Sequence, residues 1–203
     1  MSIDTASLSG RQRYRLITSL VVPRPIGWIS TYSAGGRRNL APFSYFNALS
    51  VAPILVGASI GLRGGSPKDT LSNIRATAAF AVNIVTERHL EAMVRTAGDW
   101  APDVDEFEEA GLVAAEATTV DAPYVTDAAA VFECRLFREV ELGAAPNTLI
   151  IGEVVAIHLS ETLEVDPDTM HVDPASLRPV GRLGLDEYTL LGELRHVPRP
   201  RVE

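Results

Sequence analysis

Apolar residues come mostly in short runs of strand length, and segments containing Pro and Gly separate these runs. Residues 26–31 are rich in β-branched and aromatic side chains, and Pro23 and Pro25 just before them exclude a helix interior. A Ser-Ala-Gly-Gly turn follows at residues 33–36, so we expect a hairpin there. Residues 51–60 are predicted to form a second, buried strand that is entered through Pro53.

Three later segments show the same strand pattern. Residues 80–85 are rich in β-branched side chains, and Asn83 among them is expected to satisfy backbone groups near the sheet. Residues 130–142 alternate apolar and polar positions, and residues 148–159 are mainly apolar. The sequence Ala-Ala-Pro-Asn at residues 144–147 separates these two segments, so we expect an antiparallel pair.

Helical signals are few. Ser66 fits an N-cap, Pro67 the first helical position and Asp69 the third, which predicts a helix over residues 67–78. Thr86 is expected to cap a second helix that runs to Arg95. Residues 1–20 are predicted to be a solvated arm or helix, and residues 174–203 a segment of ordered loops. Residues 99–109 are predicted to be an acidic solvated loop, and a role in ordering a dimer rim or in shielding the pocket stays open for them.

Strands of this spacing, with few helices between them, favour a mainly β fold over a doubly wound parallel sheet. We therefore predict an antiparallel β-barrel with short helices attached, in a single domain over residues 1–203. The chain contains neither a G-x-G-x-x-G motif after a strand nor a G-x-x-x-x-G-K-[ST] loop. The two standard nucleotide-binding loops are therefore absent.

Composition narrows the class of protein further. Apolar residues make up 46% and charged residues 22% of the chain, as in packed globular proteins. A net charge of −8 argues against nucleic-acid binding. Residues 39–62 carry no charge and are long enough to span a membrane, but Pro42, Pro53 and several polar residues favour buried strands and turns, so no membrane association is expected.

Cysteine and histidine provide no metal or disulfide framework. Cys134 is the one cysteine, which excludes an internal disulfide and a multi-thiolate zinc site and favours a cytoplasmic protein. We expect Cys134 to be a buried structural thiol. The four histidines form no ligand pair at helical spacing and are predicted to be surface or strand residues, so no metal site is assigned. For His158, an approach to a partner chain's site stays open.

Two segments have the chemistry of a ligand site. A cation in the first turn of a helix is disfavoured by the helix dipole, so Lys68 suggests a nearby anion that the backbone N–H groups and the Thr70 hydroxyl could help to hold. The alternative is a surface lysine that reaches solvent. Residues 28–31 and 39–50 mix small hydroxyls, an amide and aromatic rings without charge, which suits a pocket for a flat heteroaromatic ligand but also an ordinary β core.

Six segments, in the same order along the chain, resemble the flavin reductase-like, FMN-binding split-barrel family, and its flavoredoxin-like branch is the most similar. They are PRPIGWIST (residues 23–31), NLAPFSYFNALS (39–50), KDTLSNI (68–74), EFEEAGL (106–112), IIGEVVAIHL (150–159) and RPVGRLGLDEY (178–188). Each motif alone is weak. The ordered set covers most of the chain, and on it the chain is identified as a member of this family.

The resemblance implies a split β-barrel that forms a homodimer and binds FMN near the subunit interface. Residues at positions that match the family's flavin contacts fall into four groups. They are Trp28, Ile29, Ser30 and Thr31, which run past the flavin; Phe46, Asn47 and Ser50, beside the isoalloxazine ring or the ribityl chain; Lys68, Asp69 and Thr70, at the phosphate; and Arg182, which could reach the flavin or its phosphate.

The resemblance also implies an FMN-dependent oxidoreductase, in which NADH or NADPH gives a hydride to flavin N5 and the electrons pass to flavin, iron or a small acceptor. The hydride step needs no general acid, so no catalytic residue is assigned. One element departs from the family. Branches that use a nicotinamide often carry Gly-Asp-His before the strand at residues 150–154, whereas this chain has Ala145, Pro146 and Asn147.

This departure keeps other functions open. The barrel could hold FMN, or another planar ligand such as haem, as an electron carrier, store or sensor without turnover of NAD(P)H. An oxidase of the pyridoxamine-phosphate type shares the barrel, but it would need a basic pocket for the substrate phosphate that the sequence does not reveal.

Overall fold

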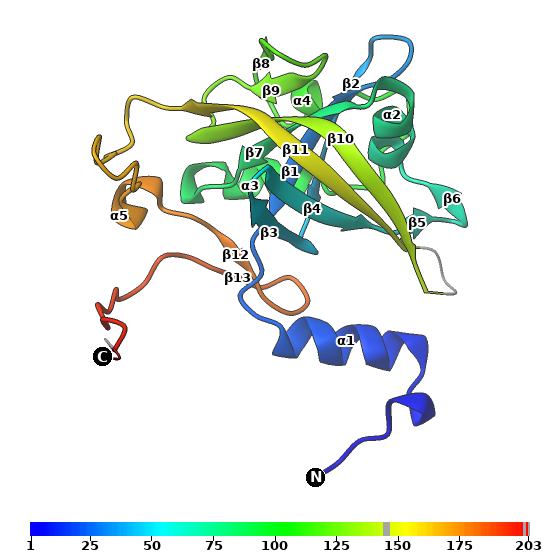
Figure 1. The fold of residues 1–203 in the computed structure, drawn as a ribbon. Coiled ribbons are helices and arrows are strands. Elements are labelled where there is room, and N and C mark those ends of the chain that lie inside the picture. Colours follow the sequence, from blue (N-terminus) through cyan, green and yellow to red (C-terminus); the bar gives the residue numbers. More distant parts are fainter. Residues whose placement is uncertain (144–146, 201, 203) are drawn as a thin grey trace.

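A seven-stranded antiparallel sheet forms the centre of the computed structural model, which describes residues 1–143, 147–200 and 202 (Figure 1). The strands lie in the order β2-β1-β7-β10-β11-β4-β3. They are β1 (Gly27–Tyr32), β2 (Arg38–Phe43), β3 (Phe46–Val51), β4 (Ile54–Ile60), β7 (Ala79–Ile84), β10 (Ala130–Leu142) and β11 (Asn147–Leu159).

Short hairpins and helices surround this sheet. The hairpins are β5 (Leu62–Arg63) with β6 (Ser66–Pro67), β8 (Ala114–Glu116) with β9 (Pro123–Val125), and β12 (Gly181–Arg182) with β13 (Tyr188–Thr189). The helices are η1 (Thr5–Ser7), α1 (Gly10–Leu20), α2 (Asp69–Thr77), η2 (Glu87–His89), α3 (Leu90–Arg95), α4 (Glu106–Glu109) and α5 (Pro174–Leu177). In Figure 1, α1 lies apart from the sheet, below β3 and the β12–β13 hairpin.

The sheet closes into a barrel that is open along one seam. Its two edge strands, β2 and β3, are consecutive in the chain, and only Ser44 and Tyr45 join them. So short a connection spans at most about 10 Å, which brings the two ends of the sheet together. In the described sheet, β2 and β3 nevertheless form no ladder with each other. The predicted mainly β fold, a split antiparallel barrel with short helices, is confirmed.

Strand β1 is buried on both faces. Trp28 packs into one hydrophobic cluster with Leu40 and Phe107, and its neighbour Ile29 packs into a second cluster with Phe80. Successive strand residues point to opposite faces, so β1 separates the two halves of the core. The strand and the hairpin to β2 were both predicted, and the pairing confirms them.

The buried amide of Asn83 joins three strands. Its Nδ2 donates to the carbonyl oxygen of Trp28 at 2.9 Å, and its Oδ1 accepts from the Val125 amide at 2.8 Å. Asn83 is fully buried, so these bonds compensate the removal of its amide and of two backbone groups from water. The predicted role of this side chain is therefore confirmed.

The longest hairpin was also predicted from its pattern. Strands β10 and β11 pair antiparallel from Ala130 with Leu159 to Leu142 with Asn147. Cys134 on β10 is fully buried, and burial raises the pKa of its thiol, which confirms a structural thiol. The predicted departure at Ala145 and Pro146 lies outside the described residues.

The start of α2 differs from the prediction. Residues 64 and 65 are glycines with φ of +55° and +86°, and they make the two-residue turn between β5 and β6. Ser66 and Pro67 therefore belong to a strand, and the predicted N-cap at Ser66 is wrong. The helix starts later, with Lys68 as its N-cap, and ends at Ala78 in the left-handed conformation, close to the predicted end.

Residues 99–109 are only partly a solvated loop. Asp105 caps α4 by accepting from the Phe107 amide, and this turn places Phe107 in the core. Glu106 is also buried and accepts from the Leu40 amide at 3.0 Å. Burial raises the pKa of the Glu106 carboxyl, and the bond from Leu40 opposes this rise. The acidic composition of this segment therefore did not reveal α4, which packs against β2.

Two further predictions need correction. Thr86 precedes η2 and α3 as expected, but its side chain makes no capping hydrogen bond. His89 is not a surface or strand residue: it is buried beside Trp28, and its Nε2 lies 3.1 Å from Asp127 Oδ1. The η2–α3 turn buries this ring, a tertiary effect that spacing alone does not indicate.

One buried guanidinium ties the two terminal segments together. Arg24 donates to the carbonyl oxygens of Thr18 and Val21, each at 2.6 Å, and to that of Leu183 at 2.7 Å. The first two lie at the C-terminal end of α1, where the helix dipole favours a cation. Arg24 thus fixes α1 against the β12–β13 segment.

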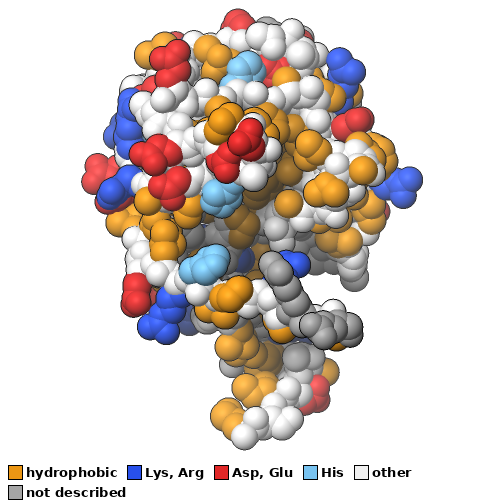
Figure 2. Space-filling model, turned by 60° about the vertical axis from the view of Figure 1, so that its left-hand side comes forward, with side chains coloured by type: hydrophobic (Ala, Val, Ile, Leu, Met, Phe, Trp, Pro, Cys, Tyr) orange, Lys and Arg blue, Asp and Glu red, His pale blue; other side chains and the backbone are white. Residues whose placement is uncertain are grey.

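Within the described residues, no helix is both long and apolar enough to cross a membrane. On the face that carries α5, acidic and basic side chains intermingle with hydrophobic ones and do not form one basic surface (Figure 2).

Close packing at Gly152 provides a test of the barrel. A Cβ atom on Gly152 would lie 2.3 Å from Phe80 Cζ and 3.2 Å from Cys134 Cβ. We expect Gly152→Ala to lower the free energy of unfolding by about 1–3 kcal/mol through overpacking, measured by urea denaturation. Gly10→Ala is the control, since no atom lies within 4 Å of a Cβ there. Equal stability of the two variants would contradict the described packing.

Candidate functional site

The first turn of α2 presents unused backbone donors. Its N-cap, Lys68, makes no side-chain capping bond, so no side chain of the cap satisfies the first N–H groups of this nine-residue helix. The helix dipole adds a partial positive charge at the same end. Lys68 is also the only lysine in the chain, against 17 arginines. The site predicted from the sequence is therefore a set of uncapped backbone donors with a cation beside it.

A second cation lies next to Lys68. Arg63, on β5, donates from Nη1 to the carbonyl oxygen of Trp100 at 2.9 Å, and the same atom lies 3.7 Å from Asp69 Oδ2. Its Nε lies 3.3 Å from Asp99 Oδ1, yet this buried atom makes no hydrogen bond. The β5–β6 turn is what brings Arg63 to the start of α2, and the sequence interpretation missed this residue.

Lys68 lies in a half-buried position. Its Nζ is 5.6 Å from the centroid of the Phe43 ring, at the end of β2. Burial, and then the charge of Arg63, lower the pKa of the Lys68 ammonium, and Asp99 opposes this change. Among the described residues, no carboxylate lies within 4 Å of Nζ. An anion that binds at this place would satisfy both cations.

A buried network of side chains holds the start of α2 against the barrel. Asn39 Nδ2 donates to Thr70 Oγ1 at 3.0 Å, and Asn73 Nδ2 donates to Thr31 Oγ1 at 3.0 Å. Asn39 also lies 3.4 Å from Thr31 Oγ1. All four side chains are buried. Thr70 therefore anchors the helix through its oxygen, and none of the hydrogen bonds found in the described residues uses its hydroxyl proton.

The predicted residues 28–31 lie deeper than the start of α2. Their side chains are all fully buried. Trp28 Nε1 donates to Thr96 Oγ1 at 2.9 Å, and Ser30 Oγ donates to the Pro123 carbonyl oxygen at 2.5 Å. Thr31 joins this segment to the network just described. In this chain the segment supports the site from beneath, and direct flavin contact by its side chains stays a prediction.

Strand β3 offers an uncharged surface at the seam of the barrel. Phe46 is buried, Asn47 is exposed and Ser50 is half-buried. Asn47 Oδ1 accepts from the Ala48 amide at 2.9 Å, which leaves its Nδ2 free to donate. β3 begins three residues after Phe43, whose ring centroid lies 5.6 Å from Lys68 Nζ. That the β3 group and the α2 group act on one ligand stays a prediction.

Arg182 lies in a different environment. Its guanidinium stacks on the Tyr188 ring at 4.5 Å, and it donates to the Tyr188 hydroxyl and to the Leu185 carbonyl oxygen. Together with Tyr14 and Ser44 it lines a cavity of about 170 Å³. None of the interactions found in the described residues joins Arg182 to Lys68, so its contact with the flavin stays a prediction.

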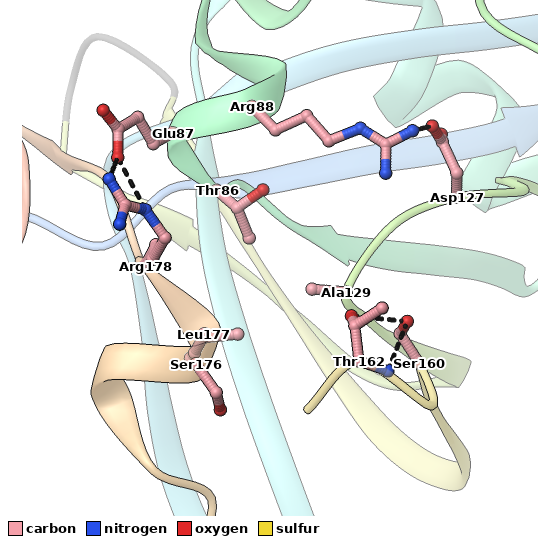
Figure 3. Close-up of a pocket in the computed structure, with 10 residues that line it drawn as sticks. All are labelled: Thr86, Glu87, Arg88, Asp127, Ala129, Ser160, Thr162, Ser176, Leu177 and Arg178. Atoms are coloured by element: carbon pink, nitrogen blue, oxygen red, sulfur yellow. Dashed lines mark hydrogen bonds and ion pairs between the residues drawn. The ribbon is translucent and has the colours of Figure 1, made fainter. Parts of the chain in front are cut away.

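A larger cavity of about 380 Å³ lies between η2, the end of β11 and α5 (Figure 3). Arg88 pairs with Asp127 on one wall, and Arg178 pairs with Glu87 on another. Both cations already have a carboxylate partner. This cavity therefore lacks the unpaired cation that Lys68 provides at α2.

The structure also forms a glutamate–histidine pair that the sequence did not reveal. Glu133, fully buried on β10, accepts from the amides of Thr118 and Thr119 at 2.7 and 2.6 Å and contacts His158 Nε2 at 2.5 Å. The His158 ring stacks on Tyr124. Burial raises the pKa of Glu133, but the hydrogen bonds outweigh burial and lower it to about 2. The pair joins β10 and β11 to the β8–β9 region.

Comparison with known protein families finds a match to the flavin reductase like domain. The sequence model of this family matches residues 19–173 of the chain. The chain is similar to the crystal structure of nitrilotriacetate monooxygenase component B from Bacillus cereus, with a TM-score of 0.92 and 31% identity over 97% of this chain and 98% of that one. A 2-nitrobenzoate 2-nitroreductase of Pseudomonas fluorescens has a TM-score of 0.90 and 32% identity, covering 98% and 96% of the two chains.

A flavoredoxin of Desulfovibrio vulgaris shares the fold, with a TM-score of 0.77 and 22% identity over 97% of each chain. The resemblance inferred from the ordered motifs is therefore confirmed.

The low pKa of Glu133 predicts a pH-dependent contribution to stability. Because the pKa falls from 4.5 to about 2 on folding, the contribution is complete above pH 4.5 and is lost as the pH falls towards 2. We expect the stability difference between wild type and Glu133→Gln to shrink by about 2 kcal/mol between pH 6 and pH 3, measured by urea unfolding. Glu141→Gln, at an exposed position on the same strand, is the control. A pH-independent difference would contradict the assigned pKa.

Proposed function

The chain belongs to the flavin reductase-like domain family, and from this premise we propose that it is an FMN-dependent oxidoreductase that passes electrons through a bound flavin. The observation that carries the proposal is the set of donors at the start of α2. Lys68, Arg63 and the uncapped N–H groups of the first turn form a cationic donor set of the kind that phosphate groups bind.

The donor set fits the phosphate of FMN in chemical type. A buried Arg63 Nε without a hydrogen bond and a lysine without a carboxylate within 4 Å, among the described residues, are groups that gain from an added anion. Lys68 and Thr70 would hold the phosphate, and Arg63 would add a second positive charge. We call this group, Arg63, Lys68, Thr70 and the first-turn N–H groups of α2, the phosphate seat. Asp69 would act through Arg63, since its carboxylate lies 3.7 Å from that side chain.

The β3 surface fits the ring system. It is uncharged, it starts three residues after Phe43, which contacts Lys68, and Asn47 keeps a free donor. Ser50 Oγ accepts from the Ala52 amide at 3.3 Å, so its hydroxyl proton is free as well. Polar donors on an apolar surface orient a heteroaromatic ligand. Asn47 and Ser50 would therefore position the flavin, while Phe46 forms the floor of the surface.

When bound, FMN supplies the capacity to accept a hydride and to pass electrons on. The residues of this chain bind and orient it, keep one face accessible and offer hydrogen-bond donors. No side chain of the site is required to transfer a proton in the hydride step. We accordingly assign binding residues and no catalytic residue.

We propose NADH or NADPH as the electron donor and flavin, ferric iron or a small organic molecule as the acceptor. The second candidate is an electron carrier or sensor without NAD(P)H turnover, and one position favours it. Asn147 stands where nicotinamide-dependent branches often have a histidine, and its Oδ1 would lie 3.1 Å from a Cβ atom added to Gly61, just before β5.

We also propose a homodimer. Large hydrophobic side chains are exposed on β3, at the start of β4 and on the outer half of β10. They are Leu49, Val51, Ile54, Phe137, Val140 and Leu142. A second copy of the chain would cover these exposed apolar side chains.

Replacement of Lys68 tests the phosphate seat. We expect Lys68→Ala to weaken FMN binding about tenfold to a hundredfold, because charge-assisted bonds contribute about 1.5–3 kcal/mol. Riboflavin, which lacks the phosphate, should bind both proteins equally. Binding is measured by the quenching of flavin fluorescence.

The matched control is Arg75→Ala. It removes a cation from the last turn of the same helix, where Arg75 pairs with Glu139 on the surface. FMN affinity should not change in this variant. An equal loss in both variants, or no loss in Lys68→Ala, would show that the phosphate does not bind at the start of α2.

The electron donor is tested separately by visible absorption under anaerobic conditions. We expect the FMN-loaded protein to bleach rapidly on addition of NADH or NADPH, because hydride transfer reduces the flavin. Bleaching with one nucleotide and not the other identifies the donor. Flavin that stays oxidised with both would exclude NAD(P)H turnover and favour the carrier function.

A further inference from the structure

An exposed carboxylate of the same chain already lies at the phosphate seat. Asp99 lies in the loop between α3 and α4, and its Oδ1 is 3.3 Å from Arg63 Nε. Its charge also acts on Lys68, where it opposes the effects of burial and of Arg63. Asp99 thus contacts Arg63 directly and acts on Lys68 through its charge alone.

The Asp99 side chain is free to leave this position. It is 91% exposed, so solvent can replace its contact with Arg63 at little cost. The loop itself is held by other groups. Trp100 Nε1 donates to the Arg95 carbonyl oxygen at 3.0 Å, and the Trp100 carbonyl oxygen accepts from Arg63. A rotation of Asp99 therefore leaves both the loop and Arg63 in place.

Charge at the seat is balanced before any ligand arrives. Two cations, Arg63 and Lys68, face two carboxylates, Asp69 and Asp99. Asp69 is fixed in the first turn of α2, whereas Asp99 is not part of a helix or strand. A phosphate monoester brings about −1.5 to −2 charges at pH 7. If Asp99 stays close, the phosphate meets an excess of negative charge.

We propose that Asp99 competes with the flavin phosphate for Arg63 and Lys68, and that this competition keeps the flavin exchangeable. The inference rests on the proposed function, because it takes the anion at α2 to be the phosphate of FMN. Asp99 is thereby a specificity-determining residue: it lowers the advantage that a phosphorylated flavin has over one without phosphate.

Removal of the Asp99 charge is the test. We expect Asp99→Asn to bind FMN about fivefold to thirtyfold more tightly at low salt, because unit charges about 4 Å apart interact by about 1 kcal/mol in water and more near a protein surface. The rate of FMN release should fall by a similar factor. The gain should shrink as salt is added, because both the seat and Asp99 contact solvent.

Two controls isolate the phosphate. Riboflavin affinity should be the same in wild type and Asp99→Asn, since no phosphate is present. Asp103→Asn removes an equal charge from an exposed position of the same loop and should leave FMN affinity unchanged. Fluorescence quenching measures both affinities, and stopped-flow dilution measures release.

The single lysine provides a readout that does not depend on flavin. Reductive methylation with ¹³C-formaldehyde labels Lys68 and the N-terminal amine, and NMR follows the titration of each. Asp99 raises the pKa of Lys68, so Asp99→Asn should lower it further, whereas Asp103→Asn should not. An unchanged pKa would show that Asp99 does not face the lysine and would overturn the inference.

The possible failures are distinguishable. If Lys68→Ala weakens FMN binding but Asp99→Asn leaves it unchanged or weaker, the competition is wrong and the phosphate seat stands. Equal gains for FMN and riboflavin would also overturn the competition, because the effect would not involve the phosphate. A wild type that binds FMN no more tightly than riboflavin would overturn both the seat and the competition.

Discussion

A buried network of hydroxyl and amide groups fixes the position and orientation of α2, and with it the first turn of this helix. Asn39 and Asn73 donate to Thr70 and Thr31, so β1, β2 and α2 are joined by side chains that water does not reach. Each unsatisfied partner in such a network would cost about 1–3 kcal/mol, which makes any other position of the helix unfavourable. The backbone donors and Lys68 are therefore fixed beside the seam of the barrel before a ligand binds.

The seam itself follows from chain connectivity. Only two residues separate the edge strands, so the sheet must curl, and Phe43 at the end of β2 comes to lie under Lys68. The uncharged β3 surface begins just beyond it. The proposed phosphate seat and the proposed surface for a planar ring both adjoin this short connection, and on that basis we relate the barrel to flavin chemistry.

Much of this could be predicted from the sequence, because apolar periodicity and the prolines mark the strands, and Lys68 opposes the helix dipole. What could not be predicted depends on contacts distant in sequence. The β5–β6 turn makes Ser66 part of a strand, so the N-cap of α2 is Lys68 and not the predicted Ser66. The same turn brings Arg63 to the start of α2. Asp99 looked like one acid of a solvated loop, since nothing local shows that it meets Arg63. The burial of Glu106 and the Glu133–His158 pair likewise require the tertiary fold.

A crystal structure of the protein with FMN tests the central claim most directly. The account predicts phosphate oxygens within hydrogen-bonding distance of Lys68 Nζ and of the first-turn amides of α2, with the ring over β3 and the Asp99 carboxylate turned away from Arg63. A phosphate held instead at Arg182, or in the cavity between Arg88 and Arg178, would contradict it.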